Sequence, residues 1–131
     1  VAAVHALAYP LGGHFHIPHG LSNALVLVQV MNFNLSHCAP LYAELAPSIA
    51  DTISLDGGDK QIAQALIDFI ANLIKQLKLP VSLAAMGIAE NDINTLANDA
   101  MLQTRLLVNN PKPVTLEDVK KIYRQAHKGM D

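Results

Sequence analysis

Tryptophan is missing from this 131-residue sequence, aromatic residues make up only 5% of it, and a single cysteine, Cys38, is present. One cysteine cannot form an internal disulfide, which excludes a disulfide-stapled scaffold and fits a reducing, cytoplasmic environment. We therefore expect a cytoplasmic protein in which Cys38 is a small buried filler. Charged residues are also scarce, at 15% of the chain against about 25% in an ordinary globular protein.

Basic runs and long hydrophobic runs are missing as well. The nine lysines and arginines are scattered and the net charge is −2, so we expect no nucleic-acid partner. The mostly apolar stretch Leu21–Met31 is about half as long as the ~20 residues that span a bilayer. We therefore expect no membrane span.

What the chain does contain is aliphatic: hydrophobic residues make up 51% of it. Such a composition suits closely packed helices in one domain, residues 1–131. Two interpretations stay open at this point. Either this is simply a very apolar helical domain, or it has more apolar surface than it can cover alone and needs a partner domain or a second subunit. Because it begins "VAAVHALA" without methionine, we expect a piece that starts inside an element.

Apolar residues recur at helical spacing and no alternating pattern indicates a strand, so the predicted fold class is all-α. The clearest helix is 60–78, where apolar residues repeat along one face and polar residues take the other. Pro10 is expected to end the first helix and to open a loop to Pro18 with a hinge at Gly12 and Gly13. The remaining expected elements are helices at 1–9, 18–34, 36–45, 90–107 and 115–127, with turns at 55–59 and 82–87.

Four histidines lie within "HALAYPLGGHFHIPHG", residues 5–20. His5 and Tyr9 are one helical turn apart and share a face, and His19 begins the next expected helix. If the loop doubles back, His5 and His19 converge on one point, as two imidazole ligands of a metal ion must. His14 and His16 lie in the expected loop without a helix to anchor them.

The alternative is that these histidines only bond to the loop and line a polar cleft. The metal interpretation has its own gap, because His5 and His19 supply two ligands and a stable site generally needs three or four. Any remaining ligands would have to lie outside this chain.

Two stretches resemble a known family. "HALAYPLGGHFHIPHGLSNALVLVQVMNFN" is similar to the second signature of the iron-containing (group III) alcohol dehydrogenases, and "NNPKPVTLEDVKKIYRQA" is similar to their C-terminal end. The likeness runs from His5 to about His127. It implies a two-domain enzyme with an N-terminal α/β domain that binds NAD or NADP. This chain resembles only the second domain, an all-α bundle of the dehydroquinate synthase-like fold.

The resemblance also implies a metal site. The family's ion, Fe²⁺ or in some members Zn²⁺, is held by an aspartate and three histidines, and the last two histidines align with His5 and His19. The aspartate and the first histidine would lie upstream of Val1. Many members carry a histidine where this chain has Tyr9, and a phenol with a pKa of ~10 is a poor base at neutral pH. Tyr9 is therefore a candidate for proton transfer or for shaping the pocket, and His14 and His16 are expected to line the cleft.

The activity implied is interconversion of small alcohols with aldehydes or ketones by hydride transfer to or from the nicotinamide. No phosphate-binding glycine loop is present in the sequence, so the cofactor-binding residues are expected on the N-terminal domain and the piece alone is expected to be inactive. A homo-oligomer, such as a dimer, is also expected. Two alternatives remain: a sister activity (glycerol dehydrogenase, maleylacetate reductase or transhydrogenase), or a non-catalytic helical interaction module.

Overall fold

The structure is a computed structural model that describes residues 2–49, 57–80 and 82–129. Within these ranges every regular element is a helix, which confirms the all-α prediction for the part described. The elements are α1 (Ala2–Phe15), α2 (His19–Ile49), α3 (Asp59–Gln76), the short 3₁₀ turn η1 (Ala84–Met86), α4 (Asp92–Met101), α5 (Thr104–Leu107) and α6 (Leu116–Lys128).

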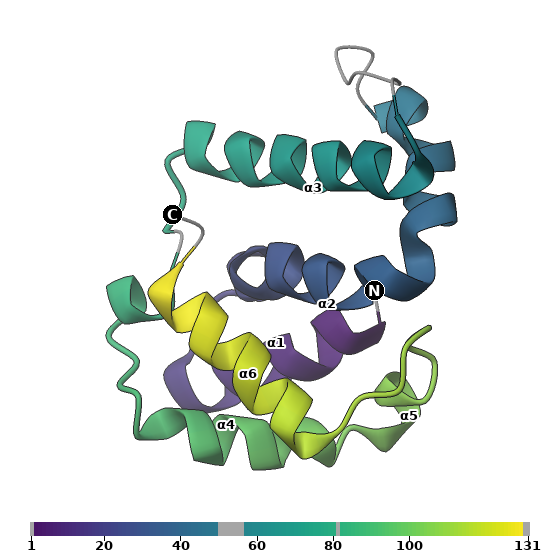
Figure 1. The fold of residues 1–131 in the computed structure, drawn as a ribbon. Coiled ribbons are helices and arrows are strands. Elements are labelled where there is room, and N and C mark those ends of the chain that lie inside the picture. The colour runs from purple at the N-terminus through teal and green to yellow at the C-terminus, as the bar shows by residue number, and fades with distance from the viewer. Residues whose placement is uncertain (1, 50–56, 81, 130–131) are drawn as a thin grey trace.

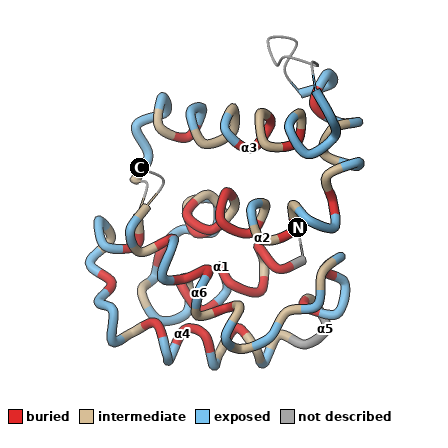
Figure 2. The backbone as a smooth tube through the Cα atoms, in the orientation of Figure 1, coloured by how far each residue is buried: buried red, intermediate tan, exposed pale blue. Residues whose placement is uncertain are grey.

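Helices α1 and α2 form the centre of the molecule (Figure 1). Helix α3 packs on one side of α2, while α4 and α6 pack together on the other side and contact α1 and α2. The main core lies among α1, α2, α4 and α6, where the buried backbone is concentrated in Figure 2. Its largest fully buried side chains include Tyr123, Leu7, Leu11 and Leu96. Small residues such as Ala3 and Ala6, both fully buried, let α1 approach its neighbours closely.

Helix α1 continues six residues beyond the end that the sequence predicted. The expected loop Pro10–Pro18 is helical as far as Phe15, and Pro10 lies inside the helix. Proline's fixed φ is compatible with helical geometry and its missing N–H removes one backbone hydrogen bond. Burial of Leu11 at 0% exposure offsets that loss, because apolar burial stabilises by roughly 1.5–3 kcal/mol for a side chain of this size. The chain reverses over His16–Pro18 instead.

The two helices predicted over 18–34 and 36–45 are a single helix, α2, which contains Pro40 and Pro47. Pro40 removes the amide that would bond to the Ser36 carbonyl, and both residues are exposed, so water can satisfy that carbonyl. Interior proline is a common cause of a kink, and α2 changes direction in its C-terminal half (Figure 1).

The merged helix bears on the membrane prediction. By length and composition alone α2 could cross a bilayer, since its best 18-residue window has a mean hydropathy of 1.2. The core helix of a globular protein passes the same test, and 44% of that window is buried inside the molecule. That no segment spans a membrane remains a prediction.

Other boundaries follow local chemistry. The helix predicted over 90–107 is broken between α4 and α5, where Leu102 and Gln103 make tighter i→i−3 bonds to Asp99 and Ala100. Leu102 is 75% exposed, so no burial favours continuing the helix there. The turn predicted at 82–87 is confirmed: Gly87 ends η1 at φ 80°, a conformation that favours glycine. Residues 55–56 of the turn predicted at 55–59 lie outside the described residues.

The amphipathic helix predicted over 60–78 is confirmed as α3, but its apolar face is only partly covered. Ile67 and Ile74 are buried in a cluster with Val28 of α2, and Leu66 is also buried. Leu73 and Leu77, in contrast, are 43% and 61% exposed. One neighbouring helix covers a narrower stripe than the apolar pattern provides. Within the described residues, therefore, part of this face has no covering element.

The predicted N-cap of the last helix is confirmed and gives a first testable result. Thr115 accepts a hydrogen bond from the Asp118 amide, and the Asp118 carboxylate accepts one from the Thr115 amide, which is a reciprocal capping box. Thr115→Ala is expected to destabilise α6 by about 1 kcal/mol, seen as faster amide exchange in its first turn. Thr115→Ser keeps the hydroxyl and should exchange like the wild type; equal loss in both variants would contradict a capping role.

Candidate functional site

The structure brings His5 and His19 together. Their ring centroids are 5.7 Å apart and the ring planes are inclined by 39°. His5 is half-buried on α1 and His19 is exposed at the first position of α2. Two imidazoles that share one ion with nitrogens at ~2.1 Å have centroids about 5 Å apart. The observed separation is therefore within a small ring movement of a shared-ligand arrangement.

A tight connection between α1 and α2 creates this approach. His16 adopts a left-handed conformation with φ 56°, and its amide donates to the Gly12 carbonyl, which is the αL termination of a helix. Ile17 is buried at 5% exposure, and its carbonyl accepts the Ser22 hydroxyl. The predicted hinge at Gly12 and Gly13 is wrong, because both residues are helical and the reversal takes place at His16.

Asn23 holds the His19 ring from one turn further along α2. Its Nδ2 donates to Nε2 of His19 at 3.3 Å. The sequence analysis missed Asn23, although its i, i+4 spacing from His19 is a signal that could have identified it.

A cavity of about 290 Å³ opens beside the His19 ring. Tyr9 lies at its edge with a side chain 66% exposed, and His19 contributes to the same wall. Gly12 and Gly13 line the cavity, and a Cβ on Gly13 would meet no atom within 4 Å. The two glycines thus serve to keep this space open. Tyr9 is close enough to the cavity to contact a molecule bound there.

The other two histidines of the motif lie away from the His5–His19 pair. His14 is the last-turn histidine of α1 and its Nε2 contacts the Asp99 carboxylate of α4. His16 is exposed and ends α1. Neither is among the residues lining the cavity. That both histidines line the cleft between this chain and an N-terminal domain remains a prediction.

The donor set fits a divalent transition metal in part. Imidazole suits iron and zinc, and His5 and His19 present two such donors side by side. Among the residues that the structure describes, no group of three histidine, cysteine, aspartate or glutamate side chains could hold an ion. A complete coordination sphere would therefore need further ligands from outside the described residues.

Comparison with known proteins agrees with this picture. Residues 1–127 match the family described as "Fe-containing alcohol dehydrogenase family, C-terminal". Long-chain-alcohol dehydrogenase 1 of Geobacillus thermodenitrificans is 35% identical over 129 residues, covering 98% of this chain and 32% of the relative. Lactaldehyde reductase of Escherichia coli K12 is 31% identical over 124 residues, covering 94% and 32%.

Solved structures give the same result. The crystal structure of a 1,3-propanediol oxidoreductase superimposes with a TM-score of 0.87 at 30% identity, covering 95% of this chain and 32% of that one. The chain thus spans about a third of the length of the relatives that it matches.

Proposed function

Because the chain belongs to the Fe-containing alcohol dehydrogenase family, whose C-terminal part it matches, we propose that the protein carrying it is a metal-dependent, NAD(P)-linked alcohol dehydrogenase. It interconverts an alcohol with an aldehyde or ketone by hydride transfer. The relatives are named for long-chain alcohols and for lactaldehyde, which supports a small-molecule alcohol or aldehyde as substrate. The single observation that carries the proposal is the approach of His5 to within 5.7 Å of His19, which itself lines a cavity.

His5 and His19 would hold the ion, Fe²⁺ or Zn²⁺, together with ligands from upstream polypeptide. When bound, the ion supplies Lewis acidity, which lowers the pKa of an alcohol or polarises a carbonyl. Their positions on α1 and at the start of α2 fix the two rings, because the three-residue connection between the helices leaves little freedom. Asn23 lies one turn further along α2 and contacts the His19 ring at Nε2; an ion bound at that nitrogen would take the place of this contact, because the nitrogen has a single lone pair.

The chain's own residues also shape the substrate space. The cavity wall formed by Gly12 and Gly13 is open, so the reacting end of an alcohol can approach the two imidazoles without a side chain in the way. The Tyr9 phenol stands at the rim, where it can donate a hydrogen bond to a substrate oxygen. NAD or NADP would bind chiefly on the N-terminal domain.

The remaining surface supports a larger assembly. Leu102 and Val108 are 75% and 76% exposed, and Val108 lines a further apolar cavity of about 260 Å³. Exposed apolar patches of this kind mark interaction surfaces. We propose that upstream polypeptide or a second subunit of a cytoplasmic homo-oligomer covers part of this surface.

The test uses the whole protein and the 131-residue chain in parallel. The whole protein is expected to reduce NAD or NADP with an alcohol, to lose this activity on chelation, and to regain it with Fe²⁺ or Zn²⁺. The chain alone is expected to show no turnover and only weak metal binding, since two ligands do not complete a site. A whole protein that is fully active without metal would contradict the proposal, as would stoichiometric tight binding by the isolated chain.

A sister activity on the same scaffold is decided by the same assay. Glycerol, maleylacetate and hydroxyacid–oxoacid pairs are offered beside simple alcohols and aldehydes. A kcat/KM for one of these that is at least about tenfold higher, or 1.4 kcal/mol in transition-state free energy, would assign that activity instead. A non-catalytic helical module would process none of the substrates and would bind no metal.

A further inference from the structure

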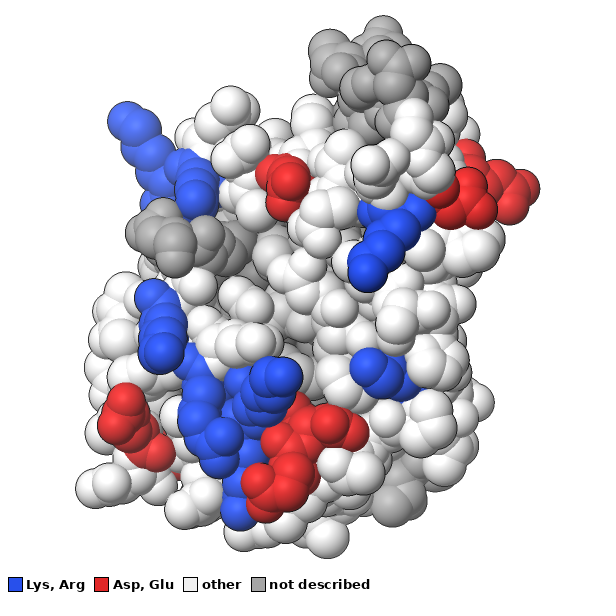
Figure 3. Space-filling model, viewed as in Figure 1, with Lys and Arg blue, Asp and Glu red and all other residues white. Residues whose placement is uncertain are grey.

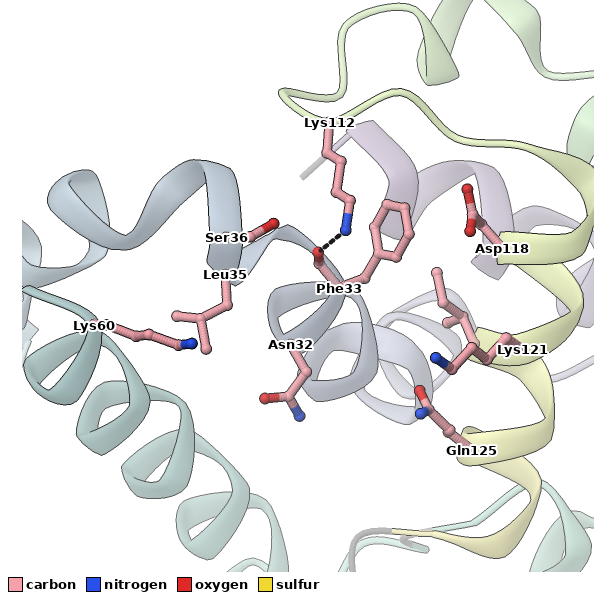
Figure 4. A pocket seen from close by; sticks show the side chains of 10 residues that line it. Asn32, Phe33, Leu35, Ser36, Lys60, Lys112, Asp118, Lys121 and Gln125 are labelled. Atoms are coloured by element: carbon pink, nitrogen blue, oxygen red, sulfur yellow. Dashed lines mark hydrogen bonds between the residues drawn. The ribbon is translucent and has the colours of Figure 1, made fainter.

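We propose that a second cavity, the cleft between α2, α3 and α6, binds a small molecule carrying a phosphate group. This cleft has a volume of about 350 Å³, within the range of small-molecule sites in proteins. It is built by separate parts of the chain and does not share a lining residue with the cavity at His19. Its walls, shown in Figure 4, are the Asn32–Ser36 region of α2, Lys60 of α3, Lys112 before α6, and side chains of α6 between Asp118 and Gln125.

Positive charge dominates this cleft. Lys60, Lys112 and Lys121 line it against one acidic residue, Asp118, so its net charge is +2. The ammonium groups of Lys60 and Lys121 point into it from opposite sides (Figure 4). In the described part of the chain no carboxylate forms an ion pair with any of the three lysines. A concave surface with unpaired charge of one sign concentrates ligands of the opposite sign.

The single acidic group in the cleft is already engaged. Asp118 accepts a hydrogen bond from the Thr115 amide through Oδ2, so one of its two oxygens is engaged in the helix cap. Basic side chains gather over α6 with acidic ones beside them (Figure 3). The three cleft lysines come from α3, from the segment before α6 and from α6, and they line one hollow.

A pair of buried asparagine side chains fixes the part of the cleft wall that carries Lys112. Asn34 and Asn110 exchange two amide hydrogen bonds, at 3.0 and 2.8 Å, and are 1% and 8% exposed. Asn110 also donates to the Lys112 carbonyl at 2.8 Å. Lys112 Nζ then reaches the Phe33 carbonyl at 3.3 Å and lies 4.4 Å from the centroid of the Phe33 ring. The cation is therefore held in place before any ligand arrives, which lowers the entropic cost of binding.

Phosphate fits this cleft better than a simple carboxylate. A phosphomonoester carries close to two negative charges at neutral pH, which matches the net charge of the lining. Lys60 is the second residue of α3 and Asp118 the third of α6, so the cleft lies near the positive ends of two helix dipoles. Leu35 and Ile122 add an apolar wall for the organic part of such a molecule.

The test is a titration of the whole protein with inorganic phosphate at constant ionic strength, balanced by chloride, with saturating NAD present to fill any nucleotide site. A saturable rise in melting temperature is expected. The triple variant Lys60→Gln/Lys112→Gln/Lys121→Gln is expected to raise the apparent Kd at least about tenfold, because charge-assisted hydrogen bonds are lost. Glycerol phosphate, titrated in parallel, shows whether an organic phosphate binds more tightly than the free ion.

A matched variant controls for net charge. Lys78→Gln/Lys120→Gln/Lys128→Gln removes the same charge outside the cleft and is expected to leave the apparent Kd within about twofold. The inference is overturned if phosphate gives no saturable shift beyond that of chloride, or if the two triple variants weaken binding equally. Alcohol oxidation is measured separately and is expected to survive in both variants. If the dehydrogenase proposal fails, the phosphate titration can still be interpreted.

Discussion

Replacing His5 or His19 with alanine in the whole protein is expected to release the bound metal and to lower kcat/KM by more than about 100-fold. Mutating a residue that only orients a metal ligand typically lowers metal affinity or activity by about 10–100-fold. We therefore expect a larger loss when the ligand itself is removed. The two rings lie 5.7 Å apart, so loss of either leaves a single imidazole from this chain. Metal content is measured by mass spectrometry beside the kinetics.

His37→Ala is the matched control. His37 is exposed on the same helix as His19, and its Nδ1 contacts only the neighbouring Ser36 hydroxyl in the hydrogen bonds of this region. The variant removes a different imidazole from the same helix, α2, and is expected to keep both the metal and the activity. If His5→Ala and His19→Ala retain full metal content, the two residues are not ligands and the cleft interpretation of the histidine motif gains support.

The same assay tests whether Tyr9 has a catalytic role. Because its phenol is 66% exposed and a poor base at neutral pH, Tyr9→Phe is expected to keep the metal and to lower kcat by less than about tenfold. General acid–base catalysis contributes typically 10²–10⁴-fold. A fall of that size, with a shifted pH profile and unchanged metal content, would instead show that Tyr9 transfers a proton.

The second large effect is expected at Tyr123, the buried tyrosine that joins α6 to α1. It is fully buried, and its hydroxyl donates to the Leu7 carbonyl at 2.5 Å. Leu7 lies between His5 and Tyr9, close to Pro10, where α1 lacks one backbone hydrogen bond. Tyr123→Ala is expected to destabilise the helical domain by about 3–5 kcal/mol through loss of packing. Tyr123→Phe should cost only about 1 kcal/mol.

The effect of this contact on α1 is measured by amide hydrogen exchange in the whole protein. Exchange in α1, residues 2–15, is expected to accelerate strongly in Tyr123→Ala and slightly in Tyr123→Phe. Arg124→Ala, at an exposed position next to Tyr123 on α6, serves as the control and should leave α1 unchanged. Equal exchange of α1 in wild type and Tyr123→Ala would contradict a supporting role for α6.

The Tyr123 hydroxyl also predicts a pH dependence. Burial raises the pKa of Tyr123 above its ordinary value, so folding favours the neutral phenol. A raised pKa contributes stability that is present below the unfolded pKa, about 10 for tyrosine, and is lost as the pH rises above it. The stability difference between wild type and Tyr123→Phe is therefore expected to be constant up to about pH 10 and to shrink at higher pH.

Much of the helical pattern was predictable because it is local. The apolar repeat of α3, the Thr115 cap and the turn ending at Gly87 each depend on residues a few positions apart. The helix boundaries at proline were wrong for the opposite reason. Pro10 disfavours a helix locally, and the burial of its neighbours in the core that α1 shares with α2 and α4 outweighs that preference.

The candidate site, like the helices, was predictable from the sequence only in part. By itself, the spacing of His5 and His19 on successive helices determined that two imidazoles could meet, and the residue types determined that a metal could be their ligand. Only the tertiary structure decided how they meet, with the chain reversing at His16 rather than at Gly12 and Gly13, and with His14 drawn away to Asp99. The cleft of Lys60, Lys112 and Lys121 has no sequence signal, because packing of α3 and α6 against α2 alone brings together lysines that are far apart in the chain.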